Sequence, residues 1–447
     1  MTGVKPHKVQ RLPLSSWQQR MAVTCSDPET SDVFQDRNLI RFAQLITPSA
    51  DLRRARRAFD KLVARHDTLR LRMVEESGSW HAVIPDTHPT GLVVEEIGDV
   101  SDAEFDRILQ ARAKAPMPIT SDALFQIILM RFGARGDVVL MRAHHAIIDG
   151  FGAILLGEEL FKLLLNMPIL QRPVSHADYV QYVERQLRRE APEAQAFWER
   201  ELLPMAPPPD LGRHAKGLPT VPGPQVARTI GLSGVLDSVE FADLAERAGR
   251  AGVTPFSVLY AGFGDVLCQA AGEEELILCS VSGRLDPALR NFVGAAMWLM
   301  PLNYRGARGK ALKDNALRVQ DKIRTAAAFL PSKAMMGPNG AVHRAFEQAG
   351  RQRLQFFVHI PEAQGRMKSS DLAKLLSASR HGEMSFGHIR VRKLDLEPQA
   401  HTDAELQLSL EESPDGPMVS FGADAASFSE FELNDLKNAL RERLEEL

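Results

Sequence analysis

Apolar positions recur along the chain with two different periods, one typical of helices and one typical of strands. Within Asp51–His66 they recur every three or four residues opposite a basic face, which predicts an amphipathic helix. Thr68–Val74 alternates between apolar and polar residues, and the alternation resumes after Gly78, which predicts a β-hairpin. Asp137–Ala143 is almost continuously apolar, as expected of a strand buried at the centre of a sheet. The opening of the chain therefore mixes helices with strands.

A proline-rich stretch separates this opening from a second series of elements. Seven prolines lie between Leu203 and Pro224, and they exclude a continuous helix or strand there, so we expect an interlobe linker. Beyond it, Thr254 and Pro255 match the N-cap and first position of a helix. We therefore expect an α+β protein with an N-terminal lobe, a bridging helix with the linker, and a C-terminal lobe. Their boundaries are residues 1–176, 177–226 and 227–447, and the last includes an expected strand at Ile389–Leu394.

Composition narrows the classes of partner and compartment. The 447 residues suffice for two lobes, and 54 Lys+Arg against 57 Asp+Glu give a formal charge of -3. That charge provides no basic field for nucleic acid or an anionic membrane. Cys25, Cys268 and Cys279 are too widely spaced for a zinc knuckle or a disulfide framework, so we expect reduced thiols. Met1–Leu12 lacks the apolar core of a secretory signal, and no uncharged apolar run is long enough to span a bilayer. We expect a soluble, cytoplasmic protein.

The clearest candidate chemistry follows the buried strand. His144 and His145 are followed, after three residues, by Asp149 and Gly150, at the point where the predicted strand gives way to a helix. A histidine with a pKa near its usual value of about 6.5 can accept a proton at neutral pH. The start of the next helix would offer backbone N–H groups to a developing oxyanion. The motif therefore suggests a general base that activates an amine or a hydroxyl group.

Two other interpretations of this motif stay open. Paired histidines could bind a metal ion, but neighbouring residues in a strand point to opposite faces, and no third ligand lies at a zinc-like spacing. Asp149 could simply cap the helix that begins at Gly150. Because only one of the two histidines can face a cleft, we expect His144 to be packed and hydrogen-bonded and His145 to face the cleft.

Around these residues the chain resembles the condensation domains of nonribosomal peptide synthetases, within the chloramphenicol acetyltransferase-like superfamily. Members of that superfamily carry an HHxxxDG motif, and His144–Gly150 matches it completely. Five further segments match the family's motifs in the right order and extend the resemblance over nearly the whole length. They are Leu14–Arg20 (LSxxQxR), Arg65–Arg70 (RHExLR), a bridging segment in His176–Trp198, Ser282–Arg284 (SGR) and Asn291–Leu302 (VGxFVNTLPL).

The resemblance implies a fold and a set of catalytic roles. The fold would be two chloramphenicol acetyltransferase-like lobes in a V-shaped pseudo-dimer, with the HHxxxDG turn at the seam. His145 would be the catalytic or positioning base, within a catalytic motif that also includes His144, Asp149 and Gly150. Asp149 would form a structural salt bridge with Arg284, and Gly150 would keep a substrate tunnel open. No metal ion is implied.

The same resemblance implies that Trp17, Gln18, Ser282 and Trp298 line this tunnel. Trp298 stands where the family usually has a small polar residue, so it would shorten the cavity and favour apolar or aromatic substrates. The run of apolar residues around Trp298 could instead be a buried strand, in which case the indole belongs to the core.

The implied activity is acyl transfer. The leading hypothesis is a free-standing condensation enzyme of natural-product biosynthesis, since no adenylation or carrier segment follows the helix predicted for Ser429–Leu447. It would move an acyl group from the phosphopantetheine thioester of an acyl or peptidyl carrier protein to a small-molecule amine or alcohol acceptor, with no bound cofactor. One alternative is an O- or N-acyltransferase that uses acyl-coenzyme A. Another is a non-catalytic module that docks carrier proteins, which is favoured when the second histidine of the motif is lost.

Overall fold

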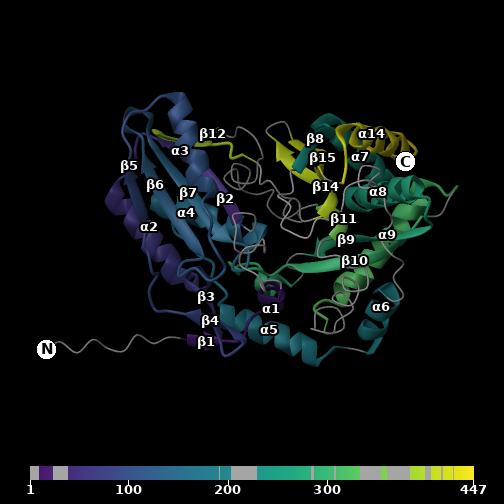
Figure 1. Cartoon of the computed structure of the whole chain (residues 1–447), viewed down its shortest axis with the longest axis horizontal. Helices are drawn as coiled ribbons and strands as arrows, with labels where there is room; N and C mark the ends of the chain where they lie inside the picture. The colour runs from purple at the N-terminus through teal and green to yellow at the C-terminus, as the bar shows by residue number, and fades with distance from the viewer. Residues whose placement is uncertain are drawn as a thin grey trace. The chain divides into compact units, whose positions relative to one another are not determined.

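The chain forms two compact units, each with a six-stranded sheet and its own helices (Figure 1). Unit 1 comprises Met1–Glu184, Arg284–Met297 and Ala363–Pro398, and unit 2 comprises Arg185–Gly283, Trp298–Glu362 and Gln399–Leu447. The α+β, two-lobed prediction is confirmed. The structure, a computed structural model, describes residues 10–23, 39–190, 192–202, 229–282, 286–306, 309–332, 354–359, 383–397, 404–413, 416–425 and 427–447.

Unit 1 contains a six-stranded sheet of order β12-β13-β2-β7-β6-β5 and a three-stranded sheet of order β1-β4-β3. Neighbouring strands are antiparallel except β5, which runs parallel to β6. Single 3-10 turns lie at Asp67–Arg70, Gly133–Arg135 and Pro287–Leu289. The elements are β1 (Gln10–Leu12), α1 (Ser16–Val23), β2 (Leu39–Thr47), α2 (Leu52–Arg65), β3 (Arg72–Glu76), β4 (Ser79–Ile84), β5 (Val93–Glu96), α3 (Asp102–Lys114), β6 (Phe125–Arg131), β7 (Asp137–His144), α4 (Gly150–Leu164), α5 (His176–Arg188), β12 (Glu383–Phe386) and β13 (Ile389–Lys393).

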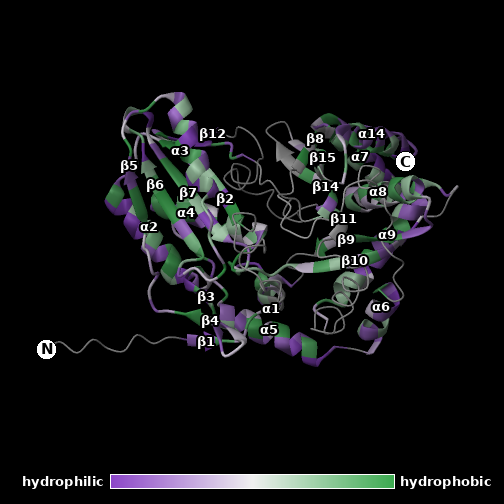
Figure 2. Cartoon of the chain, in the orientation of Figure 1, coloured by the Kyte–Doolittle hydropathy of each residue, from purple (hydrophilic) through white to green (hydrophobic). Residues whose placement is uncertain are grey.

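Helices pack on both faces of the six-stranded sheet of unit 1, and β7 contributes side chains to the apolar core on each face. All eight residues of β7 are buried, as its apolar run predicts. Val139 and Met141 pack in one core with α2 and α4, whereas Val138 and Leu140 pack in a second core with α3. This follows from the two-residue period of a strand, which sends alternate side chains to opposite faces. Along α2, apolar and hydrophilic residues interleave, as Figure 2 shows. The strand that ends at the HHxxxDG turn is therefore held rigidly on both faces.

Local sequence signals set the boundaries of these elements. Asp51 caps α2, with its Oδ1 accepting a hydrogen bond from the backbone N–H of Arg54 at 2.7 Å. The hairpin around Gly78 is present as β3 and β4, but its first strand begins at Arg72 rather than at Thr68. Residues before Arg72 form a 3-10 turn instead, because the backbone N–H groups of Leu69 and Leu71 donate to carbonyls three residues back.

Two segments expected in the C-terminal lobe belong to unit 1. The strand predicted at Ile389–Leu394 is β13, which pairs antiparallel with β2, with Val391 opposite Ile46. Residues 286–297 also belong to unit 1, where Val174 and Phe292 form a parallel β-bridge. The boundary of 227–447 for the C-terminal lobe is therefore wrong for these segments, because long-range strand pairing is independent of position along the chain. The proline-rich linker and Cys25 lie outside the described residues.

Unit 2 has a mixed sheet of order β10-β9-β11-β14-β15-β8, in which β11 runs parallel to both β9 and β14 and the other pairs are antiparallel. The predicted helix cap at Thr254 is confirmed, and the helix predicted for Ser429–Leu447 is capped by Ser429. The elements are α6 (Pro192–Leu202), β8 (Thr229–Leu236), α7 (Ser238–Ala251), α8 (Pro255–Ala271), β9 (Glu275–Ser282), β10 (Trp298–Arg305), α9 (Leu312–Ala328), β11 (Leu354–His359), β14 (Ala404–Ser413), β15 (Gly416–Asp424) and α14 (Glu430–Glu445).

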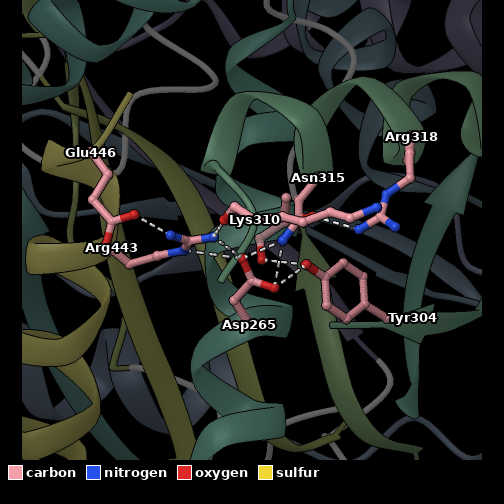
Figure 3. Close-up of polar contacts among 8 residues, drawn as sticks. Asp265, Tyr304, Lys310, Asn315, Arg318, Arg443 and Glu446 are labelled. Carbon is pink, nitrogen blue, oxygen red and sulfur yellow. Dashed lines mark hydrogen bonds and ion pairs between the residues drawn. The ribbon is translucent and has the colours of Figure 1, made fainter. Parts of the chain in front are cut away.

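A partly buried carboxylate, that of Asp265, joins four elements of unit 2 (Figure 3). Asp265 of α8 accepts hydrogen bonds from the Tyr304 hydroxyl of β10 at 2.6 Å and from Asn315 of α9 at 2.8 and 2.9 Å. It also forms an ion pair with Arg443 of α14, with Nη2 2.8 Å from Oδ2. Burial and the nearby Asp265 carboxylate raise the pKa of Tyr304 well above its usual value, so this hydroxyl stays a donor. The network fixes how three helices meet one strand.

Cys268 and Cys279 are both buried, and neither forms a disulfide within the part of the chain that the structure describes. Burial raises the pKa of Cys268 to about 11, so it is protonated at neutral pH. Among the described residues, no single helix has the length and apolar composition needed to cross a membrane, and one bent pair, α7 with α8, meets the criterion only when the two helices are joined.

Candidate active site

The HHxxxDG residues form a tight turn between β7 and α4 in unit 1. β7 is flanked by β2 and β6, and Leu39 lies opposite His144 in the pairing with β2. The backbone N–H of His144 donates to the carbonyl of Leu124 at 2.8 Å, and its carbonyl accepts from Ile147 at 3.0 Å. The first residue of the motif is therefore still part of the sheet, and the next residue is the first to leave it.

His144 is fully buried and has a structural role. Its Nδ1 accepts a hydrogen bond from the backbone N–H of Ala146 at 3.0 Å. Because Nδ1 acts as an acceptor, the neutral ring carries its proton on Nε2. The expectation that His144 is packed and hydrogen-bonded is confirmed. Its ring stabilises the turn through this hydrogen bond.

His145 is half-buried, in contrast to His144. No described group forms a hydrogen bond with its Nδ1. The indole of Trp17 contacts the imidazole, with ring centroids 5.5 Å apart and a 50° angle between the planes. The backbone around this histidine is fixed, whereas the ring's Nδ1 is not engaged by described residues. Within the motif, His145 is therefore the histidine available for chemistry.

Asp149 fills the helix-cap role that we considered, and it also binds a distant loop. Its Oδ1 accepts from the backbone N–H of Gly152 at 2.7 Å, which caps α4. Its Oδ2 accepts from the backbone N–H of Ala296 at 2.9 Å, and its own N–H donates to the carbonyl of Gly294 at 3.4 Å. The Gly152 N–H, one of the expected oxyanion donors, is thus already bound. Asp149 joins the catalytic turn to residues 286–297.

Gly150 and Gly294 differ in what a side chain at each position would contact. A Cβ on Gly150, at the exposed first position of α4, would meet no atom within 4 Å. Packing within the protein therefore does not require glycine there, and open space in front of it fits the predicted role of keeping a tunnel open. A Cβ on Gly294 would lie 2.1 Å from the ring of Phe292, so close packing does require glycine there. Phe292 in turn stacks on Tyr179, with centroids 4.5 Å apart.

Residues Arg65–Arg70 (RHDTLR) are not part of the turn, but they bind the helix and the loop next to it. His66 and Arg65 both bind the buried carboxylate of Glu159 on α4, at 2.7 and 2.8 Å. Burial alone would raise the pKa of Glu159, but the hydrogen bonds and charges of these two residues outweigh it and lower the pKa. The buried Thr68 hydroxyl donates to the carbonyl of Val293. The motif therefore fixes α4 to α2 and holds the loop that binds Asp149.

Trp17 and Gln18 bind the backbone of the turn. The indole Nε1 of Trp17 donates to the carbonyl of His145 at 3.0 Å, and Nε2 of Gln18 donates to the carbonyl of Ala146 at 3.1 Å. Gln18 is 2% exposed. The sequence assigned both residues to a substrate tunnel, and no contact with a substrate is described. What the structure adds is that their polar atoms hold the peptide groups beside His145.

Three other residues were predicted for the site, and none of them is described at this turn. Arg284, the expected partner of Asp149, lies outside the described residues. Trp298 and the backbone of Ser282 lie opposite each other in β10 and β9 of unit 2. Trp298 is 6% exposed at the start of a strand, as the core interpretation of this residue requires. Their place in a tunnel stays a prediction.

Sequence reasoning missed the groups that bind the motif from a distance. Ala296 contributes only a backbone N–H, and Thr68 contributes one hydroxyl to a backbone carbonyl. A backbone donor leaves no signature in residue type, so no pattern could have identified Ala296. The resemblance of residues 65–70 to a family motif was the available signal for Thr68, and that signal did not indicate what Thr68 contacts.

This chain belongs to the condensation-domain family. The family model described as "Condensation domain" matches residues 8–330, well over half of the chain, and this match includes the HHxxxDG turn and both sequence-distant segments that bind it.

Curated relatives are much longer proteins. The chain is 25% identical over 319 residues to a plipastatin synthase of Bacillus subtilis, which covers 69% of this chain and 12% of that protein. It is 23% identical over 456 residues to a linear gramicidin synthase of Brevibacillus parabrevis, covering 97% of this chain and 8% of that protein. The chain thus spans about a tenth of the length of these relatives.

Solved structures share the fold at low sequence identity. The X-domain from teicoplanin biosynthesis has a TM-score of 0.75 and 17% identity, with 99% of this chain and 96% of that chain covered. The SgcC5 protein from Streptomyces globisporus has a TM-score of 0.69 and 20% identity, with 97% and 99% covered. At these identities the likeness establishes the condensation-domain fold.

Proposed function

We propose that this protein is a condensation enzyme that transfers an acyl group from a carrier-bound phosphopantetheine thioester to an amine or alcohol acceptor, with His145 as the base. The observation that carries the proposal is the difference between the two histidines. His144 is buried and bound to the backbone, whereas the His145 side chain is half-buried and its Nδ1, a buried atom, has no hydrogen-bond partner among the described residues. A base needs this combination of a fixed backbone and an available ring.

The reaction balances with groups that the chain and its substrates supply. The acceptor nitrogen or oxygen attacks the thioester carbon as His145 accepts its proton. The new C–N or C–O bond forms, the C–S bond breaks, and the proton passes from His145 to the departing thiolate of phosphopantetheine. Gly150, whose Cβ position faces open space, leaves room for the substrates beside this histidine. No resident cofactor or metal ion is part of the proposal.

Two features of the relatives bear on the choice of acceptor and on a second candidate function. SgcC5 is described in complex with a naphthyl-substituted 1,2-ethanediol, which supports including alcohols among the acceptors. The teicoplanin X-domain is described in a complex with OxyB, which supports a protein-docking module as the second candidate. His145 favours catalysis over docking, because a docking surface has no use for an available base at the end of a buried strand.

The proposal is tested by following the acyl group. The protein is incubated with an acylated carrier protein or with acyl-coenzyme A, together with panels of amines and alcohols, and intact mass spectrometry measures acyl loss and product. Turnover from the carrier supports the proposal, and turnover from acyl-coenzyme A alone establishes the alternative acyltransferase. Carrier binding without acyl loss from any donor establishes the docking module.

The His145→Ala variant is the control for the base. We expect it to fold normally, because the side chain is half-buried and makes no described hydrogen bond, and to lower transfer by about 100-fold or more. Turnover is compared with that of wild type at saturating acceptor, with thermal unfolding measured in parallel. Near-normal turnover would remove His145 from the mechanism and leave substrate positioning as the source of the rate.

A further inference from the structure

Helix α1 contacts the catalytic turn through two neighbouring side chains. Nε1 of Trp17 donates to the carbonyl oxygen of His145 at 3.0 Å, and Nε2 of Gln18 donates to the carbonyl oxygen of Ala146 at 3.1 Å. The Trp17 indole also packs against the imidazole of His145 at a centroid distance of 5.5 Å. Two consecutive peptide groups, beginning with that of the proposed base, are thus bound by one short helix.

Gln18 connects the start of this helix to the turn. Its Oε1 accepts from the backbone N–H of Ser15 at 2.9 Å, while the Ser15 hydroxyl accepts from the backbone N–H of Gln18 at 3.3 Å. These reciprocal bonds form a capping box, which defines where α1 begins. The amide therefore has its oxygen on the helix cap and its nitrogen on the turn. Its position on α1 sets the position of the Ala146 carbonyl.

The bonds from α1 differ in kind from those that hold the rest of the turn. The carbonyls of His144 and Asp149 accept from backbone N–H groups of Ile147 and Ala153, and the Ala146 N–H donates to the buried His144 ring. For the carbonyl of His145, the Trp17 indole is the donor that the structure describes. The orientation of the His145 peptide, and with it the direction of the side chain, depends on this bond.

Anchoring of α1 does not depend on the two polar bonds. Leu14, Met21 and Ala22 are buried in the apolar core of unit 1. Trp17 itself is only half-buried. Removing the indole N–H while keeping an aromatic ring therefore leaves the helix attached to the core and releases the His145 carbonyl alone.

We propose that Trp17 is a positioning residue for His145, and that Trp17 and Gln18 together form a clamp that holds the imidazole in its reactive orientation. The clamp keeps the peptide plane of His145 fixed, and the indole limits rotation of the ring. A fixed base contributes more to the rate than a mobile one, because the proton must be taken in one geometry. The expected effect of the clamp on kcat rests on the proposed function, whereas its expected effect on the mobility of the His145 ring does not.

The kinetic test uses Trp17→Phe, with Trp198→Phe as its matched control. Trp198 also donates its indole N–H to a backbone carbonyl, that of Phe329 at 3.2 Å, but it belongs to unit 2, whereas the HHxxxDG turn belongs to unit 1. We expect Trp17→Phe to lower kcat by about 10- to 100-fold with KM changed by less than about twofold. Trp198→Phe should keep wild-type kcat. Equal kcat for Trp17→Phe and wild type, or equal losses in both variants, would overturn the clamp.

An activity-independent measurement separates the clamp from the proposed function. The 13 histidines are labelled with ¹³C at Cε1, and the signal of His145 is identified by its loss in His145→Ala. Relaxation of this signal should report a more mobile ring in Trp17→Phe than in wild type or Trp198→Phe. If wild type transfers no acyl group, the proposed function fails, yet this relaxation still decides the clamp. Unchanged mobility refutes it.

Gln18→Glu provides a second variant in case Trp17→Phe does not fold. Glutamate keeps an oxygen for the Ser15 N–H, so the capping box is retained, but it places a second oxygen against the carbonyl of Ala146. We expect wild-type helix content, a more mobile His145 ring and a lower kcat, with the loss greatest at high pH, where the carboxyl has no proton to donate to the Ala146 carbonyl. A wild-type ring mobility and kcat in this variant contradict the role of Gln18.

Discussion

At the scale of single residues, the two adjacent histidines of the HHxxxDG turn lie in different environments. His144 and His145 are neighbours, yet one ring stabilises the turn through Ala146 while the other is half-exposed. The cause is the strand itself, because alternate residues of β7 point to opposite faces and β7 ends at His144. The ring of His145, the first residue after the strand, is therefore the one that we propose as the base.

A second residue-scale feature is His176, a histidine with no described bond to its Nε2 and only 2% exposure. Burial lowers its pKa to about 4, partly opposed by a hydrogen bond to the backbone of Pro13. Between pH 6.5 and pH 4 the unfolded chain therefore binds a proton at this residue that the folded chain does not. Stability contributed by this site should fall as the pH falls through this window.

We predict that His176→Gln weakens this acid sensitivity. Urea unfolding of wild type and variant is measured at several pH values from 7 to 4. The wild-type free energy of unfolding should decrease relative to that of the variant by up to about 3 kcal/mol across the window, the product of the pKa shift and 1.36 kcal/mol per unit. Other titrating groups cancel in the difference. Parallel pH curves for the two proteins would show that His176 is not the source.

At the scale of elements, the HHxxxDG turn is held by segments that are remote in sequence. Helix α1, the loop of residues 286–297 and the end of α2 each contribute bonds to it or to α4. Gly294 allows the loop to approach, since its backbone lies against the Phe292 ring that stacks on Tyr179. Asp149 is bound to this loop through the backbone of Gly294 and Ala296.

We predict opposite effects for the two glycines near Asp149. Gly294→Ala places a methyl group within the Phe292 ring and should destabilise the protein by about 1–3 kcal/mol, the usual range for overpacking. Gly150→Ala meets no protein atom and should keep or slightly raise stability, because alanine is the better helix former, while lowering acyl transfer. Denaturant unfolding and turnover are measured for both. Loss of stability in Gly150→Ala, or none in Gly294→Ala, would contradict the packing argument.

At the scale of the whole molecule, each unit has its own core. The apolar clusters that contain β7 draw only on unit 1, and the cluster around α8 draws only on unit 2. Eleven of the 17 residues of α8 are buried, and the Asp265 network joins this helix to β10, α9 and α14. Damage to that network should therefore act on unit 2 first.

We predict that Asp265→Ala destabilises unit 2 by about 3–5 kcal/mol, because it leaves Arg443 and the Tyr304 hydroxyl without their carboxylate. Hydrogen exchange measured by mass spectrometry should show faster exchange in α8 than in β7. The control is Glu104→Ala, which removes an exposed ion pair with Arg107 and should change stability by less than about 1 kcal/mol. Equal loss of protection in both units would refute independent cores.

By itself, the sequence determined the features that are encoded over a few residues. Periodicity predicted α2 and β7, the cap at Thr254 marked a helix start, and the position of the HHxxxDG motif between strand and helix was correct. Each of these depends on residues within a turn or two of one another. The resemblance to condensation domains extended this to the family and to the expected role of His145.

Only the tertiary structure decided which distant segments meet at the turn. The pairing of β13 with β2, the Ala296 N–H on Asp149 and the Trp17 indole on the His145 carbonyl join residues more than 100 positions apart. Two of these contacts involve backbone atoms that every residue possesses, and the third is a strand pairing that any alternating segment could make. Such interactions leave no local pattern, because packing of the whole unit selects the partner.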